Sequence, residues 1–251
     1  SQSDVVILIA DDLESSHNVA ALRLKDGIVG NPAAPRDGRL LLVSSIWGEM
    51  ADFAEPYGGV WLQTGPGGEP ALVDALAKRA SGETAPLSAV AGETHVADEL
   101  LALAKDPAKV VSIVYAPSPV DAVAAGEGAK AAANLAIALR GERAAESLFV
   151  LPTEANVYGA RDMGVDPERA PGRVPAAQAG MQFRQMIDAA IDGTLKAMIV
   201  VGDNPLMFAP DRARVEQALA SLDLLIVIDS VLTDTAKMAH VVFADVPAYA
   251  K

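Results

Sequence analysis

The chain has 251 residues, a formal net charge of −13 and no cysteine. Without cysteine it cannot form disulfides, thiolate zinc sites or cysteine-ligated iron–sulfur clusters. The negative charge would repel phosphates and anionic lipid headgroups, so we expect no direct contact with nucleic acid or membrane.

Short β-branched runs alternate with longer helical patterns, which indicates βαβ units and a mainly parallel sheet. The predicted strands are Val5–Ala10, Leu40–Ser44, Val60–Gln63, Val110–Ala116, Leu148–Leu151, Ala197–Gly202, Leu224–Asp229 and Val241–Ala244. The predicted helices are Val19–Val29, Pro70–Arg79, Val96–Ala104, Val120–Leu139, Ala179–Ile191, Arg212–Ser221 and Thr233–Ala239. Because the fourth helix contains Gly126 and Gly128, we expect it to be kinked or split.

Two stretches interrupt this alternation. Residues 80–95 read as a surface excursion, and residues 152–178, rich in proline and glycine, are predicted to contain no regular element. A structureless stretch of that length usually has a function or connects two domains. We therefore place a domain boundary near residue 150, giving domains 1–150 and 151–251, the second of them partial.

Nucleotide-binding motifs of the common kinds are absent: the sequence contains neither a P-loop nor a G-x-G-x-x-G after a strand. The nearest feature is the glycine-rich turn Thr64–Glu69, which leads into a helix and could bind an anion. Glu69 lies in the first turn of that helix and would satisfy the helix end itself. A tight turn with an acidic first helical turn is therefore the favoured interpretation.

Carboxylates follow the first strand at Asp11, Asp12 and Glu14. At the carboxyl end of a parallel strand they could hold Mg²⁺ or a ribose, or they could cap a helix starting near Ser16. Capping is the favoured interpretation.

No catalytic group emerges from the residue pattern. The three histidines, His17, His95 and His240, are far apart and lack metal-ligand spacing, so each is interpreted as a surface or packing residue. The sequence has no G-x-S-x-G and no H-E-x-x-H. We predict no catalytic residue and no metal site in this chain.

Four segments in the second half occur in a specific order. Asn156–Gly164 reads N-x-x-G-A-x-D-M-G, and Lys196–Leu206 reads K-A, four apolar residues, then G-x-N-P-L. An apolar strand ending in aspartate (Leu222–Asp229) and the pattern T-x-T-A-x-x-A-x-V-V (Thr233–Val242) follow. Together with the opening strand and Glu14 and His17, this series resembles the molybdopterin oxidoreductase family over essentially the whole chain.

The resemblance implies two Rossmann-like α/β domains with parallel sheets, present here as an interior fragment. In that family two such domains hold a pterin guanine dinucleotide at the carboxyl ends of their strands. The positions that the resemblance assigns to the pterin or the guanine are Asp12, Gly159, Asp162, Gly202 and Asn204.

Three departures from the family pattern affect this site. Ser44-Ser45-Ile46-Trp47 stands where a D-P-R turn is usual, Pro152-Thr153-Glu154 where R-G-Q is found in formate dehydrogenases, and Ile228 where glutamine is common. Losing a guanidinium weakens the hold on a pyrophosphate, and isoleucine cannot donate to a guanine edge. The five positions are therefore expected to be vestigial, with the molybdopterin lost.

Such erosion resembles the large iron–sulfur subunit of NADH-quinone oxidoreductase (complex I). This resemblance implies a structural role in the peripheral arm at the cytoplasmic face of the inner membrane, with other complex I subunits as partners. Iron–sulfur clusters would lie in the rest of the polypeptide. Two alternatives stay open: a fragment of a cofactor-binding formate dehydrogenase, and an unrelated α/β domain for a small nucleotide.

Overall fold

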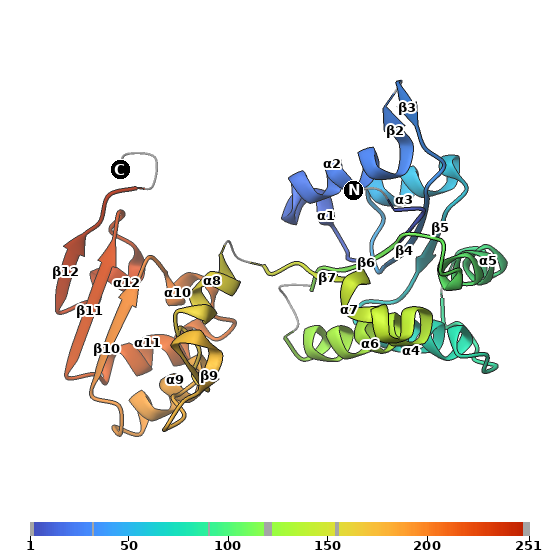
Figure 1. Ribbon diagram of the computed structural model, residues 1–251. Coiled ribbons are helices and arrows are strands. Elements are labelled where there is room, and N and C mark those ends of the chain that lie inside the picture. The colour runs from blue at the N-terminus through green and yellow to red at the C-terminus, as the bar shows by residue number, and fades with distance from the viewer. Residues whose placement is uncertain (1–2, 32, 90, 118–121, 154–155, 248–251) are drawn as a thin grey trace. The chain divides into compact units, whose positions relative to one another are not determined.

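The computed structural model describes residues 3–31, 33–89, 91–117, 122–153 and 156–247. The chain divides into two compact units, residues 1–155 (unit 1) and 156–251 (unit 2) (Figure 1). The boundary predicted from the sequence lay between residues 150 and 151, in the segment just before this division.

Unit 1 is built on a five-stranded parallel sheet with the order β5-β4-β1-β6-β7. Its strands are β1 (Val5–Ile9), β4 (Arg39–Ser44), β5 (Val60–Gln63), β6 (Val111–Tyr115) and β7 (Leu148–Val150). The chain winds outward from β1 to β5 and then returns to place β6 on the other side of β1. Ligands of open α/β sheets bind at this reversal, beyond the carboxyl ends of the strands.

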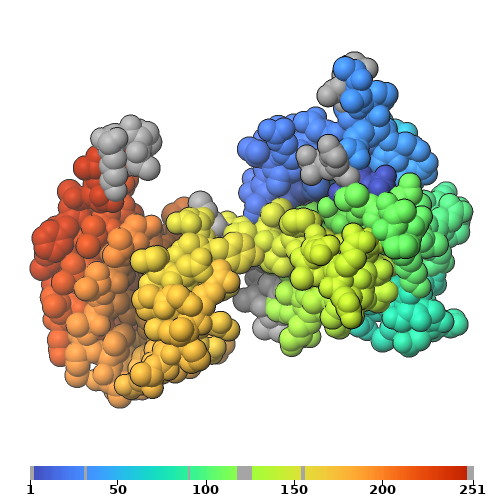
Figure 2. Space-filling model, in the orientation of Figure 1, coloured from blue at the N-terminus to red at the C-terminus, as the bar shows by residue number. Residues whose placement is uncertain are grey.

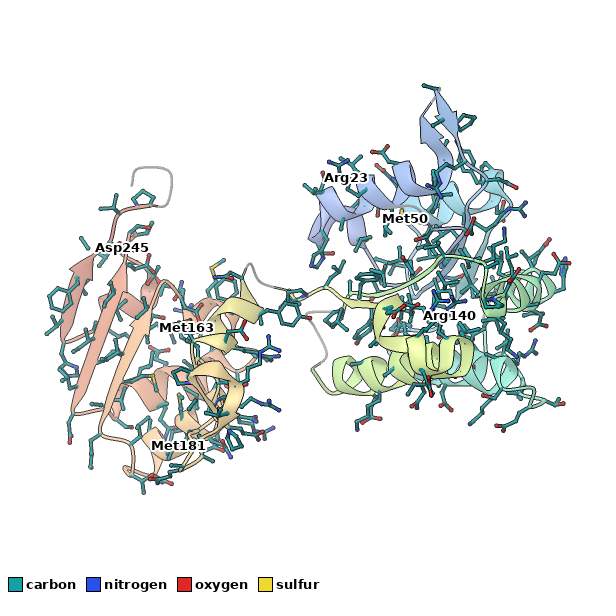
Figure 3. All side chains as sticks on the ribbon, viewed as in Figure 1. Arg23, Met50, Arg140, Met163, Met181 and Asp245 are labelled. Carbon is teal, nitrogen blue, oxygen red and sulfur yellow. The ribbon has the colours of Figure 1, made fainter. Side chains whose placement is uncertain are left out.

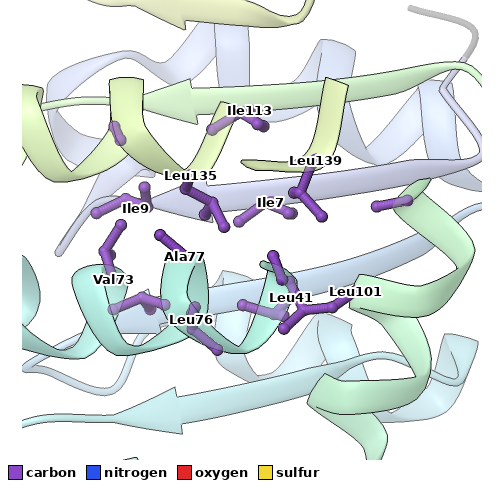
Figure 4. Packing of buried hydrophobic residues seen from close by; sticks show 14 of the residues in the cluster. Ile7, Ile9, Leu41, Val73, Leu76, Ala77, Leu101, Ile113, Leu135 and Leu139 are labelled. Carbon is purple, nitrogen blue, oxygen red and sulfur yellow. The ribbon is translucent and has the colours of Figure 1, made fainter. Parts of the chain in front are cut away.

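Helices cover both faces of this sheet because the strands are apolar on both sides. The first face packs against α1 (Leu13–Ser16), α2 (Asn18–Val29) and α3 (Glu49–Ala54), with Met50 of α3 buried there (Figure 3). The second face packs against α4 (Glu69–Ala80), α5 (Thr94–Lys105) and α6 (Ala122–Arg140). Figure 4 shows Ile7, Leu41 and Ile113 of that face between the helices.

Short elements complete unit 1. They are the hairpin β2 (Gly30–Asn31) and β3 (Ala34–Pro35), the 3-10 turns η1 (Glu55–Tyr57) and η2 (Gly141–Arg143), and α7 (Ala144–Ser147). The sequence pattern did not predict them, nor α3, because each is too short to display a hydrophobic period.

Unit 2 contains a three-stranded parallel sheet of β10 (Ala197–Val201), β11 (Leu224–Asp229) and β12 (Val241–Ala244). Its core lies between this sheet and the helices α9 (Phe183–Ile191), α10 (Pro205–Phe208), α11 (Arg212–Ala220) and α12 (Asp234–Lys237). Val200, Leu225 and Val227 face these helices and are buried. This arrangement and that of unit 1 confirm the predicted α/β fold with parallel sheets.

The opposite face of the unit 2 sheet is apolar, and no described residue of unit 2 covers it. Ile199 and Val201 of β10 are 63% and 64% exposed, and Phe243 of β12 is 55% exposed. The strand register aligns Val201 with Ile228 and Phe243, so these side chains form one row. Figure 2 shows β10 to β12, in orange to red, at the surface of unit 2. Parallel sheets are normally covered on both faces, so this face lacks its usual second layer.

Two predictions about regular structure were wrong. Residues 152–178 contain α8 (Val157–Asp162), the strand pair β8 (Arg169–Ala170) and β9 (Val174–Pro175), and the turn η3 (Pro171–Arg173). The helix expected to be kinked at its glycines is continuous over Ala122–Arg140, although residues 118–121, where the prediction began, lie outside the described residues. Gly128 is accommodated because it packs against the ring of Tyr115, where a side chain would collide.

Candidate functional site

The five positions assigned by resemblance lie next to the strand ends or in the segment that opens unit 2. Asp12 follows β1 in unit 1. The other four belong to unit 2, with Gly159 and Asp162 on α8 and Gly202 and Asn204 in the turn between β10 and α10.

Asp12 caps a helix. Its carboxylate accepts a hydrogen bond from the backbone N–H of Ser15 at 3.1 Å, as the side chain of an N-cap residue does. The capping interpretation is therefore confirmed, but the capped helix begins at Leu13 and not near Ser16.

The neighbouring Asp11 makes the contact that the sequence analysis missed. One of its carboxylate oxygens accepts hydrogen bonds from both the backbone N–H and the hydroxyl of Ser45, each at 2.8 Å. This pair joins the ends of β1 and β4 at the carboxyl edge of the sheet. Sequence order hid it, because 34 residues separate the two partners.

Glu69, at the start of α4, adds a second carboxylate to this edge. Burial raises its pKa, and the nearby charge of Asp11 raises the pKa further. Nearby donors, first its own backbone N–H and then Ser45 and the N–H of Gly67, lower the pKa, but among the described residues Glu69 Oε1 is buried without a hydrogen-bond partner. Glu69 thus lies in the first turn of α4, as the tight-turn interpretation predicted, but no side chain caps the helix start by a hydrogen bond.

Lys25, in the helix α2 that follows the first strand, is already bound. Lys25 of α2 lies 3.1 Å from Glu14 and 2.8 Å from Glu49. The ammonium group therefore links α2 to α1 and to α3. It is not free to neutralise an incoming anion.

The N-x-x-G motif has a local structural explanation. Asn156 adopts a left-handed backbone conformation (φ 59°) before α8, and its side chain lies directly over Gly159, where any larger residue would collide with it. Asp162 forms an ion pair with Arg173 of η3, the element against which α8 mainly packs. Gly159 and Asp162 thus hold the opening segment of unit 2 together.

The G-x-N-P motif is likewise engaged within unit 2. The side-chain carbonyl of Asn204 accepts hydrogen bonds from the hydroxyl of Thr235 at 2.7 Å and from its backbone N–H at 3.3 Å. Thr235 is completely buried and links α10 to α12. Gly202 differs, because it has a left-handed φ of 61° and no atom near its Cβ position.

Each histidine has a partner within its own surroundings. His17 contacts the carbonyl of Pro152 at 2.8 Å, His240 accepts from the N–H of Leu225 at 2.9 Å, and exposed His95 lies near Glu93. Within the described ranges no three His, Asp or Glu side chains are grouped so that they could hold a metal ion. No helix among the residues that the structure covers is long and apolar enough to cross a membrane.

The family assignment follows from comparison with known proteins. The model of the molybdopterin oxidoreductase family matches residues 93–248, more than half of the chain. The chain belongs to the molybdopterin oxidoreductase family. The match contradicts the alternative of an unrelated α/β nucleotide domain.

Relatives within this family include several oxidoreductases. The alpha subunit of an NADPH-Fe(3+) oxidoreductase from Geobacter sulfurreducens is 37% identical over 47% of the chain and 16% of its own length. A subunit of an NADH-quinone oxidoreductase from Rhizobium meliloti is 30% identical over 95% of the chain and 30% of its own length. The alpha subunit of an F420-dependent formate dehydrogenase from Methanocaldococcus jannaschii is 33% identical over 54% and 22%, respectively.

The chain thus spans less than a third of each of these three relatives.

Among solved structures, the formyltransferase/hydrolase complex of Methylorubrum extorquens superposes with a TM-score of 0.55 at 18% identity, covering 97% of this chain and 62% of that one. At this identity the likeness shows a shared fold and nothing about activity.

The carboxyl edge of unit 1 does not fit the pyrophosphate of a pterin dinucleotide. Phosphate sites use free backbone N–H groups and cations. Here the N–H and the hydroxyl of Ser45 already donate to the carboxylate of Asp11, and the carboxyl group of Glu69 lies close enough for the charge of Asp11 to raise its pKa. An anionic ligand would have to displace these carboxylates and would meet their charge. In unit 2 the open surroundings of Gly202 leave room, but the side-chain carbonyl of Asn204 is committed to Thr235.

Proposed function

We propose that this chain is a segment of the large iron–sulfur subunit of an NADH-quinone oxidoreductase, in which the family fold serves as a scaffold and holds no pterin dinucleotide. In this proposal Asp12, Gly159, Asp162, Gly202 and Asn204 are vestigial cofactor positions. Electrons pass through iron–sulfur clusters in other parts of the polypeptide, and no residue of this chain is catalytic.

The observation that carries the proposal is the contact between Asp11 and Ser45. A carboxylate that takes both donors of Ser45 occupies the place where the ends of β1 and β4 would meet a phosphate. Glu69 strengthens the effect, since its carboxyl group lies close enough for Asp11 to raise its pKa. The near-complete coverage of the chain by the Rhizobium meliloti relative supports the choice of this branch of the family.

The bare sheet of unit 2 supports a role within a larger assembly. A row of apolar side chains on one face of a parallel sheet is unfavourable in water and is normally covered by helices. Several relatives carry names of oxidoreductase subunits, which agrees with burial of this face against further protein. In the proposal the partners are other subunits of the peripheral arm, at the cytoplasmic face of the inner membrane.

The test uses the natural protein that contains this sequence. After purification, molybdenum and tungsten are measured by mass spectrometry, and guanine nucleotide released by acid is measured by chromatography. We expect less than a tenth of an equivalent of each. Stoichiometric metal together with guanine nucleotide would refute the proposal.

The second candidate is a segment of a formate dehydrogenase that binds the cofactor by other residues. It is favoured by one observation, the open space around Gly202, and by the formate dehydrogenase relative. Formate oxidation by the same purified protein would support it. If metal and nucleotide are absent and NADH-quinone activity is present, this candidate fails and the first one stands.

A further inference from the structure

A groove runs along the β5 edge of unit 1, away from the carboxylates described above. Its first part has a volume of about 550 Å³ and is lined by Trp47, Ala51, Asp52, Glu55, Pro56 and Trp61. A second part of about 750 Å³ shares Glu55 and Trp61 with it and extends past Glu93 and Glu99. Both tryptophans of the chain therefore line one surface feature.

The aromatic walls of this groove are held in place. The indole N–H of Trp61 donates to the hydroxyl of Ser44 at 2.8 Å, and this hydroxyl donates to the carbonyl of Ile46 at 2.9 Å. Ser44 is completely buried, so one residue fixes both the Trp61 ring and the turn that carries Trp47. Trp47 itself is 65% exposed and has a face available for a ligand.

Most carboxylates that line the groove have no ion-pair partner among the described residues. Among the residues covered by the structure, Asp52, Glu55 and Glu99 are in no ion pair, and the pair of Glu93 is with His95, at 3.5 Å. The cationic lining residue, Arg39, lines the second part and is paired with Asp37. Unit 1 carries 21 acidic and 11 basic residues, so the long-range field also favours a cation.

We propose that this groove binds an extended basic segment of a partner polypeptide, with a lysine or arginine side chain between Trp47 and Trp61. Cations are attracted to indole faces within about 6 Å of the ring centroid, and nearby carboxylates strengthen this attraction. Backbone pairing to β5 is obstructed at Gln63, whose N–H donates to the carbonyl of Ala91. Recognition is therefore by side chains and charge, independently of the proposed function.

The two tryptophans provide the assay, because their fluorescence reports on the groove. The chain is titrated with a capped nine-residue peptide of alternating Arg and Gly, followed by fluorescence and by calorimetry. The matched peptide carries citrulline in place of arginine, which keeps the shape and removes the charge. We expect saturable binding of the arginine peptide and at least tenfold weaker binding of the citrulline peptide.

Two matched variants locate the site. Asp52→Asn/Glu55→Gln should weaken binding at least tenfold, whereas Glu142→Gln/Glu146→Gln, which removes the same charge elsewhere in unit 1, should change it less than twofold. All four side chains are exposed, so both variants should fold, which circular dichroism checks. Equal weakening by the two variants, or no binding at 1 mM peptide in calorimetry, would overturn the proposal.

Discussion

The Asn204→Ala substitution tests whether the G-x-N-P motif of this chain stabilises the fold. Asn204 could serve a ligand, as the family pattern implies, or it could serve the packing of unit 2. In the structure its side-chain carbonyl accepts two hydrogen bonds from Thr235, which is fully buried. Alanine removes both bonds at once.

The expected loss follows from the two contacts. A hydrogen bond within a protein contributes about 1 kcal/mol net, and a buried donor left without an acceptor adds to the cost. The shorter bond, at 2.7 Å, should contribute fully, and the longer one, at 3.3 Å, less. We therefore expect the unfolding free energy of unit 2 to fall by about 2 kcal/mol, which for a unit of this size lowers the Tm by roughly 8 to 16 °C.

Two optical signals separate the units in this measurement. Both tryptophans, Trp47 and Trp61, lie in unit 1, so their fluorescence follows unit 1, whereas far-UV circular dichroism follows both units. Asn204→Ala should shift only the dichroism transition. Asn204→Asp keeps the acceptor oxygen and should lose less than about 1 kcal/mol. A loss below about 0.5 kcal/mol for Asn204→Ala would refute the structural role of this side chain.

Three further outcomes are expected. Leu41→Ala and Leu225→Ala empty different cores and should each cost about 2–5 kcal/mol. Leu41→Ala should shift the fluorescence transition together with the unit 1 part of the dichroism transition, whereas Leu225→Ala should shift the dichroism alone. A shift of the fluorescence transition by Leu225→Ala would contradict separate cores. Burial raises the pKa of Glu69, so its contribution to stability is present below its unfolded pKa and is lost as pH rises through the folded pKa. The urea midpoint of the Glu69→Gln variant should therefore equal that of the parent near pH 4 and exceed it at pH 7. The same difference in midpoint between variant and parent at both pH values would refute this. Ile199→Lys, on the bare face, should change the unfolding free energy by less than about 0.5 kcal/mol and reduce self-association in size-exclusion chromatography, whereas unfolding would show that the face is packed.

The sheets could be predicted from the sequence because their strands are short, continuous apolar runs. The helices instead are longer segments in which polar residues interrupt the apolar ones. The main failure, at residues 152–178, has a physical cause. The six-residue helix α8 depends on the left-handed Asn156 and on the contact of its side chain with Gly159, neither of which changes hydrophobic periodicity. Short elements fixed by such contacts carry no signal in a pattern of apolar spacing.

The site was predictable only in part. Asp12 could be interpreted as a helix cap because an N-cap side chain bonds to a backbone N–H only a few residues further along the chain. Glu69 could be placed in the first turn of a helix because it follows a glycine-rich turn. The Asp11–Ser45 pair could not be found, since it depends on how β4 pairs with β1. The sequence did contain one signal for this pair: Ser45 lies in the segment where the family pattern usually has a D-P-R turn, which carries an arginine.

Retention of family motifs in this chain is therefore weak support for a bound cofactor. Asp12 caps α1, Gly159 makes room for Asn156, and Asn204 anchors Thr235, so each would be retained for stability alone. Gly202 has no packing neighbour, but its left-handed backbone already favours glycine. In the proposal, the positions that distinguish a site with cofactor from one without it lie instead at the ends of β1 and β4. Asp11 and Ser45 are hydrogen-bonded to each other there, and a pyrophosphate at that place would have to break this contact.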